Sequence, residues 1–352
     1  MIEKKIFSFA ASIIKFFIIY LFFLNANATT VNKKYYHEER GILSIMYHRF
    51  GEHKYPSTNI AMNVFKEHIK LIKDKKLEFF NPENLADEFN KVKKQKKILI
   101  TIDDGFTSFY EKAWPYLREH KIPFILFIST QAVGKKGYMT WEQIKDVEKE
   151  EFAFIGNHSH THEYLIEFNF DDFKKDINKS IEIFNYKLGY NPIYFSYPFG
   201  EYSFEHEEFI ASKFKFGFGQ HSGVIDLNKN KYELPRFPIN EKYGDLKRFK
   251  SVISYLPLQY KNVIPRDKLL NNTNNPPKLI IEFFEEQKNL NNITCYSNEG
   301  NKWKQSNINL KNNYLEVKFV EKFNFRRGRI NCSLNDKEGW RFFGIQFSNN
   351  LN

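Results

Sequence analysis

Four side chains in the first half of the sequence have the types that a hydrolytic metal site needs: Asp103, Asp104, His158 and His162. A divalent metal such as Zn²⁺ accepts imidazole nitrogen and carboxylate oxygen, and a hydrolytic site commonly takes three protein ligands and leaves a position for water. Asp104, His158 and His162 would supply those ligands, which leaves Asp103 as a free proton acceptor. We therefore expect a divalent cation, Zn²⁺ in the first place, with Co²⁺, Ni²⁺ or Fe²⁺ as alternatives.

Short apolar runs directly before these residues predict the elements that position them. Ile98–Ile102 precedes the two acids, and Phe152–Gly156 leads into the loop that carries both imidazoles. Between the two runs, Ser108–His120 has a helical pattern and Ile122–Ile128 is again strand-like. Because the carboxyl ends of parallel strands meet at one edge of a sheet, we expect the acids and imidazoles to converge there.

The same alternation continues on both sides of this unit. The other expected strands are Ile42–Tyr47, Ile193–Tyr197 and Phe216–Phe218, and the other expected helices include Met62–Lys76, Asp171–Leu188 and Glu205–Lys213. Strands that alternate with helices at this spacing predict an α/β fold with a parallel sheet or barrel over residues 29–263.

The pattern changes near residue 264. The Asn- and Pro-rich run 271–277 predicts a linker, which we place at 264–278, and short alternating strand-like runs follow over 279–352. These runs predict a small β-sandwich. Cys295 and Cys332 are the only cysteines, and in an exported protein such a pair favours a disulfide, which would stabilise a small domain.

The first 28 residues have the features of a signal peptide. Lys4 and Lys5 precede the apolar run Phe16–Leu24, and Ala26–Ala28 has the small-x-small pattern of a cleavage site. We expect an exported protein, located in the periplasm, at the cell surface or secreted. An uncleaved membrane anchor is the alternative.

The net charge of +11 gives only weak evidence about the kind of partner that the protein binds. A basic chain could favour an anionic polymer or a membrane surface. Its lysines are scattered among glutamates and asparagines, however, and the sequence has no basic helix and no aromatic-basic nucleic-acid motif. We expect no nucleic-acid partner.

Three motifs resemble, in order and spacing, those of the polysaccharide deacetylase family, the NodB-homology domain of carbohydrate esterases. Thr101–Gly105 resembles T-F-D-D-G, His158–His162 resembles H-[ST]-x-x-H, and Ser196–Gly200 stands where R-x-P-[YF]-G is expected. The resemblance covers roughly residues 40–260. Met46–Arg49 and Leu234–Pro238 are similar to exported members that act on poly-N-acetylglucosamine and related polymers.

The resemblance implies a distorted (β/α) barrel and the removal of acetyl groups from an N-acetylated polysaccharide, with release of acetate. It implies that Asp104, His158 and His162 hold the metal and that Asp103 is the general base. It also implies that a backbone N–H in the turn after Tyr197, that of Phe199, stabilises the oxyanion. His48, Tyr197 and Pro198 are expected to line the substrate site, although His48 could equally be a buried structural histidine.

Two departures from the family pattern are visible. The arginine of the third motif, which in the family orients the base, is replaced by Ser196, and Arg236 is our candidate for its substitute. The alternative is that Arg236 pairs with a surface acid. The family's general-acid histidine has no clear match, and His221 is the best candidate by order along the chain.

These gaps keep two other functions open. An O-acetyl ester hydrolase would need less proton donation, because an alkoxide-type group leaves more readily than an amine. A non-catalytic glycan-binding protein with a degenerate barrel is the other alternative, in which the C-terminal domain docks a cell-envelope partner.

Overall fold

The computed structural model describes residues 33–349. The signal peptide expected over 1–28 lies outside the described residues. Within the described part, no helix combines the length and the apolar character needed to cross a membrane.

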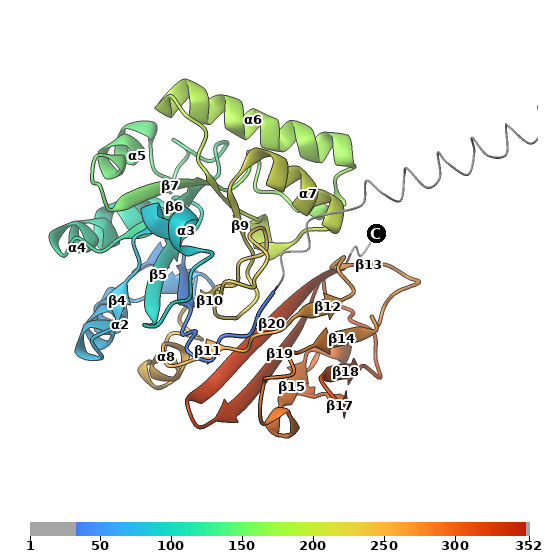
Figure 1. Ribbon diagram of the computed structural model, residues 1–352. Helices are drawn as coiled ribbons and strands as arrows, with labels where there is room; N and C mark the ends of the chain where they lie inside the picture. The colour runs from blue at the N-terminus through green and yellow to red at the C-terminus, as the bar shows by residue number, and fades with distance from the viewer. Residues whose placement is uncertain (1–32, 350–352) are drawn as a thin grey trace, which may run out of the picture. The chain divides into compact units, whose positions relative to one another are not determined.

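A parallel sheet of eight strands is the framework of the first two thirds of the chain (Figure 1). Its strands lie in the order β10-β1-β5-β6-β7-β8-β9, with β4 beside β5. All neighbouring pairs are parallel, so the predicted α/β fold, a distorted (β/α) barrel, is confirmed. The strands are β1 (Ile42–Tyr47), β4 (Glu78–Phe79), β5 (Lys97–Ile102), β6 (Phe124–Ile128), β7 (Ala153–Asn157), β8 (Tyr194–Ser196), β9 (Phe216–Phe218) and β10 (Phe237–Pro238).

Helices follow most strands and lie around the sheet in Figure 1. The α-helices are α2 (Met62–Asp74), α3 (Leu85–Glu88), α4 (Trp114–Glu119), α5 (Trp141–Glu148), α6 (Phe170–Leu188), α7 (Phe204–Lys213) and α8 (Leu246–Val252). Shorter elements are η1 (Pro82–Asn84), the π-turn η2 (Phe109–Ala113), η3 (Leu165–Glu167), η4 (Pro198–Gly200), and the small sheet of β2 (Arg49–Phe50) and β3 (Asn59–Ile60). The cap of α5 has the geometry that its sequence suggests, because Thr140 and Gln143 form a capping box.

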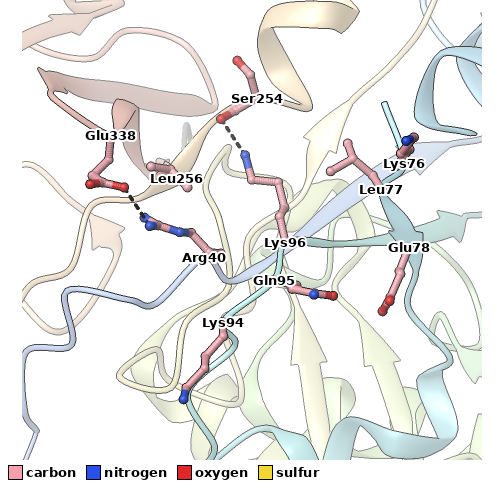
Figure 2. A pocket seen from close by; sticks show the side chains of 10 residues that line it. All are labelled: Arg40, Lys76, Leu77, Glu78, Lys94, Gln95, Lys96, Ser254, Leu256 and Glu338. Carbon is pink, nitrogen blue, oxygen red and sulfur yellow. Dashed lines mark hydrogen bonds and ion pairs between the residues drawn. The ribbon is translucent and has the colours of Figure 1, made fainter. Parts of the chain in front are cut away.

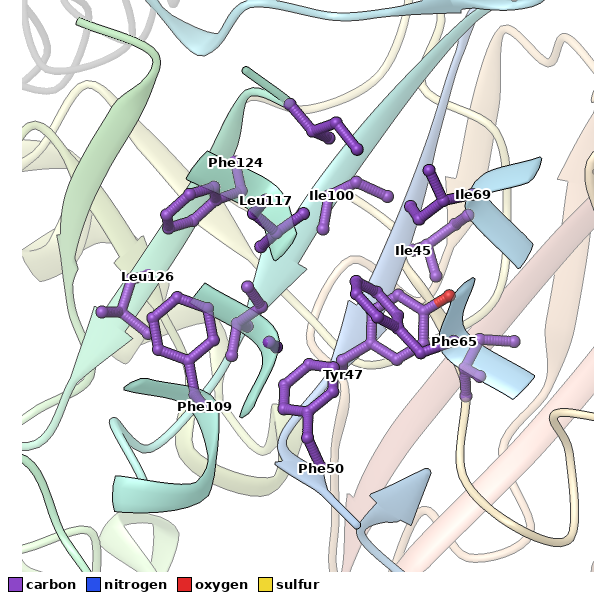
Figure 3. Packing of buried hydrophobic residues seen from close by; sticks show 14 of the residues in the cluster. Ile45, Tyr47, Phe50, Phe65, Ile69, Ile100, Phe109, Leu117, Phe124 and Leu126 are labelled. Atoms are coloured by element: carbon purple, nitrogen blue, oxygen red, sulfur yellow. The ribbon is translucent and has the colours of Figure 1, made fainter. Parts of the chain in front are cut away.

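The main core lies between the central strands and the helices that pack on them. Figure 3 shows side chains of β1, β5 and β6 (Ile45, Ile100 and Leu126) beside the aromatic rings of Phe65 and Phe109. Every residue of β5 after Lys97 is buried, which explains why its sequence is a continuous apolar run rather than an alternating one.

The C-terminal part contains two sheets in which most neighbouring strands are antiparallel. One has the order β11-β20-β19-β15-β16 with β13 beside β20, and the other is β12-β14-β18-β17. Cys295 and Cys332 are register partners in β15 and β19 and are joined by a disulfide. The bounds are β11 (Leu256–Pro257), β12 (Asn262–Ile264), β13 (Leu269–Leu270), β14 (Leu279–Glu282), η5 (Leu290–Asn292), β15 (Thr294–Ser297), η6 (Glu299–Asn301), β16 (Lys304–Gln305), β17 (Asn307–Lys311), β18 (Tyr314–Lys318), β19 (Arg327–Asp336) and β20 (Gly339–Asn349).

The stretch that composition predicts as a linker, 264–278, carries a strand of the C-terminal sheets. Its strand β13 lies parallel to β20, and β11, from the range expected to be barrel, pairs with β20 as well. A two-residue strand is too short to show the alternating pattern of a longer strand, so nothing in the sequence indicates these pairings. The barrel and the C-terminal sheets belong to one compact unit that begins at Tyr35.

The core packing predicts a large loss of stability for Phe65→Ala. The Phe65 ring is fully buried and lies 5.2 Å from the ring of Tyr47 and 5.0 Å from that of Phe50. Its removal should lower the free energy of unfolding by about 3–5 kcal/mol, measured by urea denaturation. Tyr186→Ala, on the exposed face of α6, should change it by less than about 0.5 kcal/mol. Equal effects would contradict this description of the core.

Candidate active site

Three loops at the carboxyl ends of β5, β7 and β8 carry the predicted site. Asp103 and Asp104 directly follow β5, His158 directly follows β7, and the turn of the third motif follows β8. These strands lie in the continuous order β5-β6-β7-β8 and run parallel, so their carboxyl ends share one edge of the sheet. The fold thereby brings together residues that are more than fifty positions apart in sequence.

Asp104, His158 and His162 form a cluster whose atoms could bind one cation. His158 Nε2 lies 3.4 Å and His162 Nε2 3.1 Å from Asp104 Oδ1, and no two of the three ligand atoms are more than 4.8 Å apart. Ligand bonds of about 2.0–2.2 Å in a tetrahedral zinc site place neighbouring ligand atoms roughly 3.3 Å apart. The spacing fits a shared divalent metal.

The unpaired atoms of the cluster also fit a metal. Asp104 Oδ1 and His158 Nε2 are buried and have no hydrogen-bond partner, a costly arrangement for polar atoms. His158 Nδ1 donates to the carbonyl oxygen of Ser196 at 2.6 Å. Because a carbonyl can only accept, Nδ1 carries the proton, and the lone pair of Nε2 faces the cluster.

The loop that holds the two imidazoles is anchored by Asp176, in the middle of α6. Its carboxylate accepts the backbone N–H groups of His160 at 2.8 Å and Thr161 at 3.0 Å. Ser159 Oγ accepts the N–H of His162 at 3.1 Å, within a loop where Ser159 and His162 both have positive φ. Sequence reasoning missed Asp176. The available signal was an acidic residue on the mostly apolar buried stripe of a helix, which also carries Ser180.

Asp103 lies outside the cluster and forms a buried ion pair with Arg236. Arg236 donates from Nη1 to Oδ1 at 2.7 Å and from Nη2 to Oδ2 at 2.9 Å, and both side chains are fully buried. Arg236 Nη2 also donates to Ser196 Oγ at 2.7 Å. Burial by itself would raise the pKa of Asp103, but the charge and hydrogen bonds of Arg236, together with the charges of His158 and His48, outweigh it and hold the pKa below its usual value.

Comparison with known proteins points to one family for this part of the chain. Residues 90–214 match the family model described as polysaccharide deacetylase. The poly-beta-1,6-N-acetyl-D-glucosamine N-deacetylase of Staphylococcus aureus is 25% identical over 240 residues, which cover 59% of this chain and 82% of that protein. Residues 90–214 are thus similar to a polysaccharide deacetylase domain, and the similarity to this relative extends beyond them.

Solved structures support the same fold for the deacetylase domain. IcaB from Ammonifex degensii aligns with a TM-score of 0.55 at 22% identity, over 61% of this chain and 97% of that one. The Streptococcus pyogenes deacetylase PplD, in complex with acetate, aligns with a TM-score of 0.53 at 21% identity, over 58% of this chain and 94% of that one. The resemblance found in the sequence motifs is therefore confirmed.

Two more predicted residues lie at the centre of the deacetylase domain. His48 follows β1, and Asp104 and Asp103 are among the charges that act on it; burial lowers its pKa despite both carboxylates. Phe199 has a left-handed backbone (φ 58°), and its ring lies 4.8 Å from that of His162. The turn's hydrogen bonds, from Gly200 N–H to Tyr197 O and from Glu201 N–H to Pro198 O, do not use the Phe199 N–H.

His221, by contrast, is not brought to the cluster. It lines a small cavity with Tyr202 and Glu233, and the charges that act on it belong to Glu233, Lys268, Lys229 and Arg236 rather than to the cluster. Burial lowers its pKa to about 4. The expectation that His221 is the general acid is corrected accordingly.

Tyr197 and Pro198 are buried and not available to line a substrate site. The Tyr197 ring stacks on that of Tyr202, with centroids 4.5 Å apart. Successive side chains at the end of a strand point to opposite faces, so Ser196 faces Asp103 while Tyr197 faces the interior. Their expected role in substrate binding is corrected for this reason.

A larger cavity lies at the other end of the sheet. It has a volume of about 480 Å³ and is lined by charged residues that include Arg40, Lys94, Lys96 and Glu338 (Figure 2). Lys96 directly precedes β5, whereas the acids directly follow it, so the length of the six-residue strand, roughly 20 Å, separates the two places. Burial lowers the pKa of Lys96 to about 7. This cavity is separate from the cluster of Asp104, His158 and His162.

The cluster predicts that His158→Ala weakens metal binding strongly, because it removes one of three ligands. Isothermal titration of the chelator-treated protein with Zn²⁺ should show at least a 100-fold weaker affinity. Mutating a residue that only hydrogen-bonds to a ligand typically weakens metal binding about 10- to 100-fold, and the loss of a ligand itself should cost more. His160→Ala is the matched control from the same loop, since His160 contacts Thr130 Oγ1 rather than the cluster. Equal affinities for the two variants would contradict the ligand assignment.

Proposed function

We propose that this protein is a metal-dependent hydrolase that removes acetyl groups from an N-acetylglucosamine-containing polysaccharide and releases acetate. The observation that carries the proposal is Asp103, a buried carboxylate that Arg236 holds beside the three-residue cluster. A glycan-binding protein would have no use for an uncoordinated acid at this place. The named activity of the Staphylococcus aureus relative supports the same substrate class.

Asp104, His158 and His162 would hold the metal, with Zn²⁺ as the first choice. When bound, a divalent metal supplies Lewis-acid chemistry, which polarises the acetyl carbonyl and lowers the pKa of water. The proposal also includes export to the periplasm or cell surface, where such polymers are found.

Asp103 accepts the proton of the attacking water in this mechanism. Both of its oxygens are held by Arg236, so the carboxylate cannot rotate, yet each oxygen keeps a further lone pair to accept a proton. Attack on the acetyl carbon gives a tetrahedral oxyanion, towards which the N–H of Phe199 would donate.

The departing amine needs a proton when the C–N bond breaks. Arg236 is among the groups that hold the pKa of Asp103 below its usual value, so the protonated Asp103 gives up its proton more readily than an ordinary carboxylic acid. We infer that Asp103 returns the proton it took from water to the amine nitrogen, which leaves acetate and a free amino sugar. This route does not need a histidine as the general acid, which is the role that was expected for His221.

Replacing Asp103 by Asn tests this role. Asp103→Asn should lower kcat at least 1000-fold, because the amide cannot accept the proton, while the Zn²⁺ affinity stays within about threefold. Acetate release from poly-N-acetylglucosamine and from chitooligosaccharides measures the first, and titration calorimetry the second. Because Arg236 would lose its charged partner, the thermal midpoint should be recorded as well. Undiminished turnover would refute the base assignment.

One observation keeps an O-acetyl ester as the alternative substrate. Among residues 33–349, the histidines whose charges act together with that of Asp103 are His158, His162 and His48. None of these is a separate proton donor outside the cluster and His48, and an alkoxide leaves with less proton donation than an amine. We expect kcat/KM to be higher on N-acetylated than on O-acetylated glycans, with both activities lost on chelation. Acetate release from chitooligosaccharides and from acetylxylan separates the two. Turnover of acetylxylan alone would favour the ester function.

A further inference from the structure

The C-terminal sheet reaches the turn that follows β8. Gln346 Nε2, in β20, donates to the carbonyl oxygens of Phe199 at 3.0 Å and Gly200 at 2.8 Å. Ser348, two residues further on the same face of the strand, accepts the N–H of Tyr202 at 3.1 Å. One strand of the C-terminal part thus bonds three positions around the turn: Phe199, Gly200 and Tyr202.

The Gln346 amide is itself fixed in one orientation. Arg329, its register partner in β19, donates from Nε to Gln346 Oε1 at 3.1 Å. Because Arg329 Nε can only donate, Oε1 must face it, and the NH₂ group must face the turn. Gln346 is 2% exposed, so water does not compete for these bonds.

Two neighbouring arginines, just before and at the start of β19, lie beside the turn and beside the ring that stacks on it. The Arg327 guanidinium lies 3.7 Å from Glu201 and 5.7 Å from the centre of the Phe199 ring. Arg326 pairs with Glu167 and lies 3.9 Å above the ring of Tyr164. Tyr164 stacks in turn on Phe199, with ring centroids 4.4 Å apart.

The turn needs this support because its backbone is strained. Phe199 has φ 58°, a left-handed conformation that costs a non-glycine residue roughly 1 kcal/mol or more. On another side the turn is blocked, since a Cβ on Gly200 would lie 2.7 Å from the backbone nitrogen of Gln220. The Phe199 N–H shares its peptide plane with the Pro198 carbonyl, which accepts the N–H of Glu201. Its direction therefore depends on the conformation of the whole turn, which includes the two carbonyls that Gln346 holds.

We propose that the C-terminal sheet is a functional part of the catalytic centre, in which Gln346 is a positioning residue that aims the Phe199 N–H at the oxyanion. This inference rests on the proposed deacetylase function. It assigns a task to β19 and β20 beyond packing, and it predicts that the barrel alone would not have full activity.

Gln346→Met in the full-length protein tests the inference, because methionine keeps the length of the side chain and removes the amide. We expect kcat to fall roughly 10- to 100-fold, as for other misplaced catalytic groups, with KM and Zn²⁺ affinity within about twofold. The matched control is Gln305→Met, on the exposed edge strand β16 of the same sheet, which should behave as wild type. A purely structural role would lower the thermal midpoint and leave kcat per metal-loaded site unchanged, and that result would overturn the proposal.

Amide hydrogen exchange over residues 197–202 supplies a readout that does not need turnover. In the Gln346→Met variant, the backbone amides of this segment should exchange faster than in the wild type, while those of α2 should exchange at the same rate. Unchanged exchange in the segment would overturn the proposal. If wild-type protein released no acetate from any glycan, the deacetylase function would fail, and the exchange result would still decide whether β20 holds the turn. Arg329→Met, which frees the Gln346 amide without removing it, should show the same changes to a smaller extent and serves if Gln346→Met does not fold.

Discussion

The buried ion pair of Asp103 and Arg236 is the interaction on which the rest of the site depends. It joins the end of β5 to the segment just before β10, and through Ser196 Oγ it also includes the end of β8. Withdrawing two charges from water is costly and is offset only when both groups are fully hydrogen-bonded, as they are here. Removal of one partner would leave the other buried and unpaired, so the base and the closure of the barrel on this side are coupled.

Four residues with a left-handed backbone and two unpaired polar atoms lie together at the same edge of the sheet. Asp104, Ser159, His162 and Phe199 all have positive φ, and Asp104 Oδ1 and His158 Nε2 lack hydrogen-bond partners. Elsewhere in the barrel the strands are buried, apolar and regular. A strained, polar region supported by a regular core is what a preorganised catalytic site requires, because its groups must be held before the substrate arrives.

The C-terminal sheets extend this support beyond the deacetylase domain. β20 pairs with β11, which comes from the end of the barrel segment, and its side chains bond the turn after β8. The boundary that composition suggests near residue 264 therefore separates two kinds of sequence pattern, but it does not separate two independent bodies.

The sequence by itself determined the parallel strands, the three motifs and the cluster of Asp104, His158 and His162, because each depends on short-range patterns: apolar runs, and polar residues at fixed spacing directly after them. Arg236 could be named as a candidate, but only the tertiary structure placed it on Asp103, 133 positions away. The roles of Asp176 and Gln346, and the inward orientation of Tyr197 and His221, were likewise decided by the fold. They depend on which faces of distant strands pack against each other, and a local sequence pattern does not specify that packing.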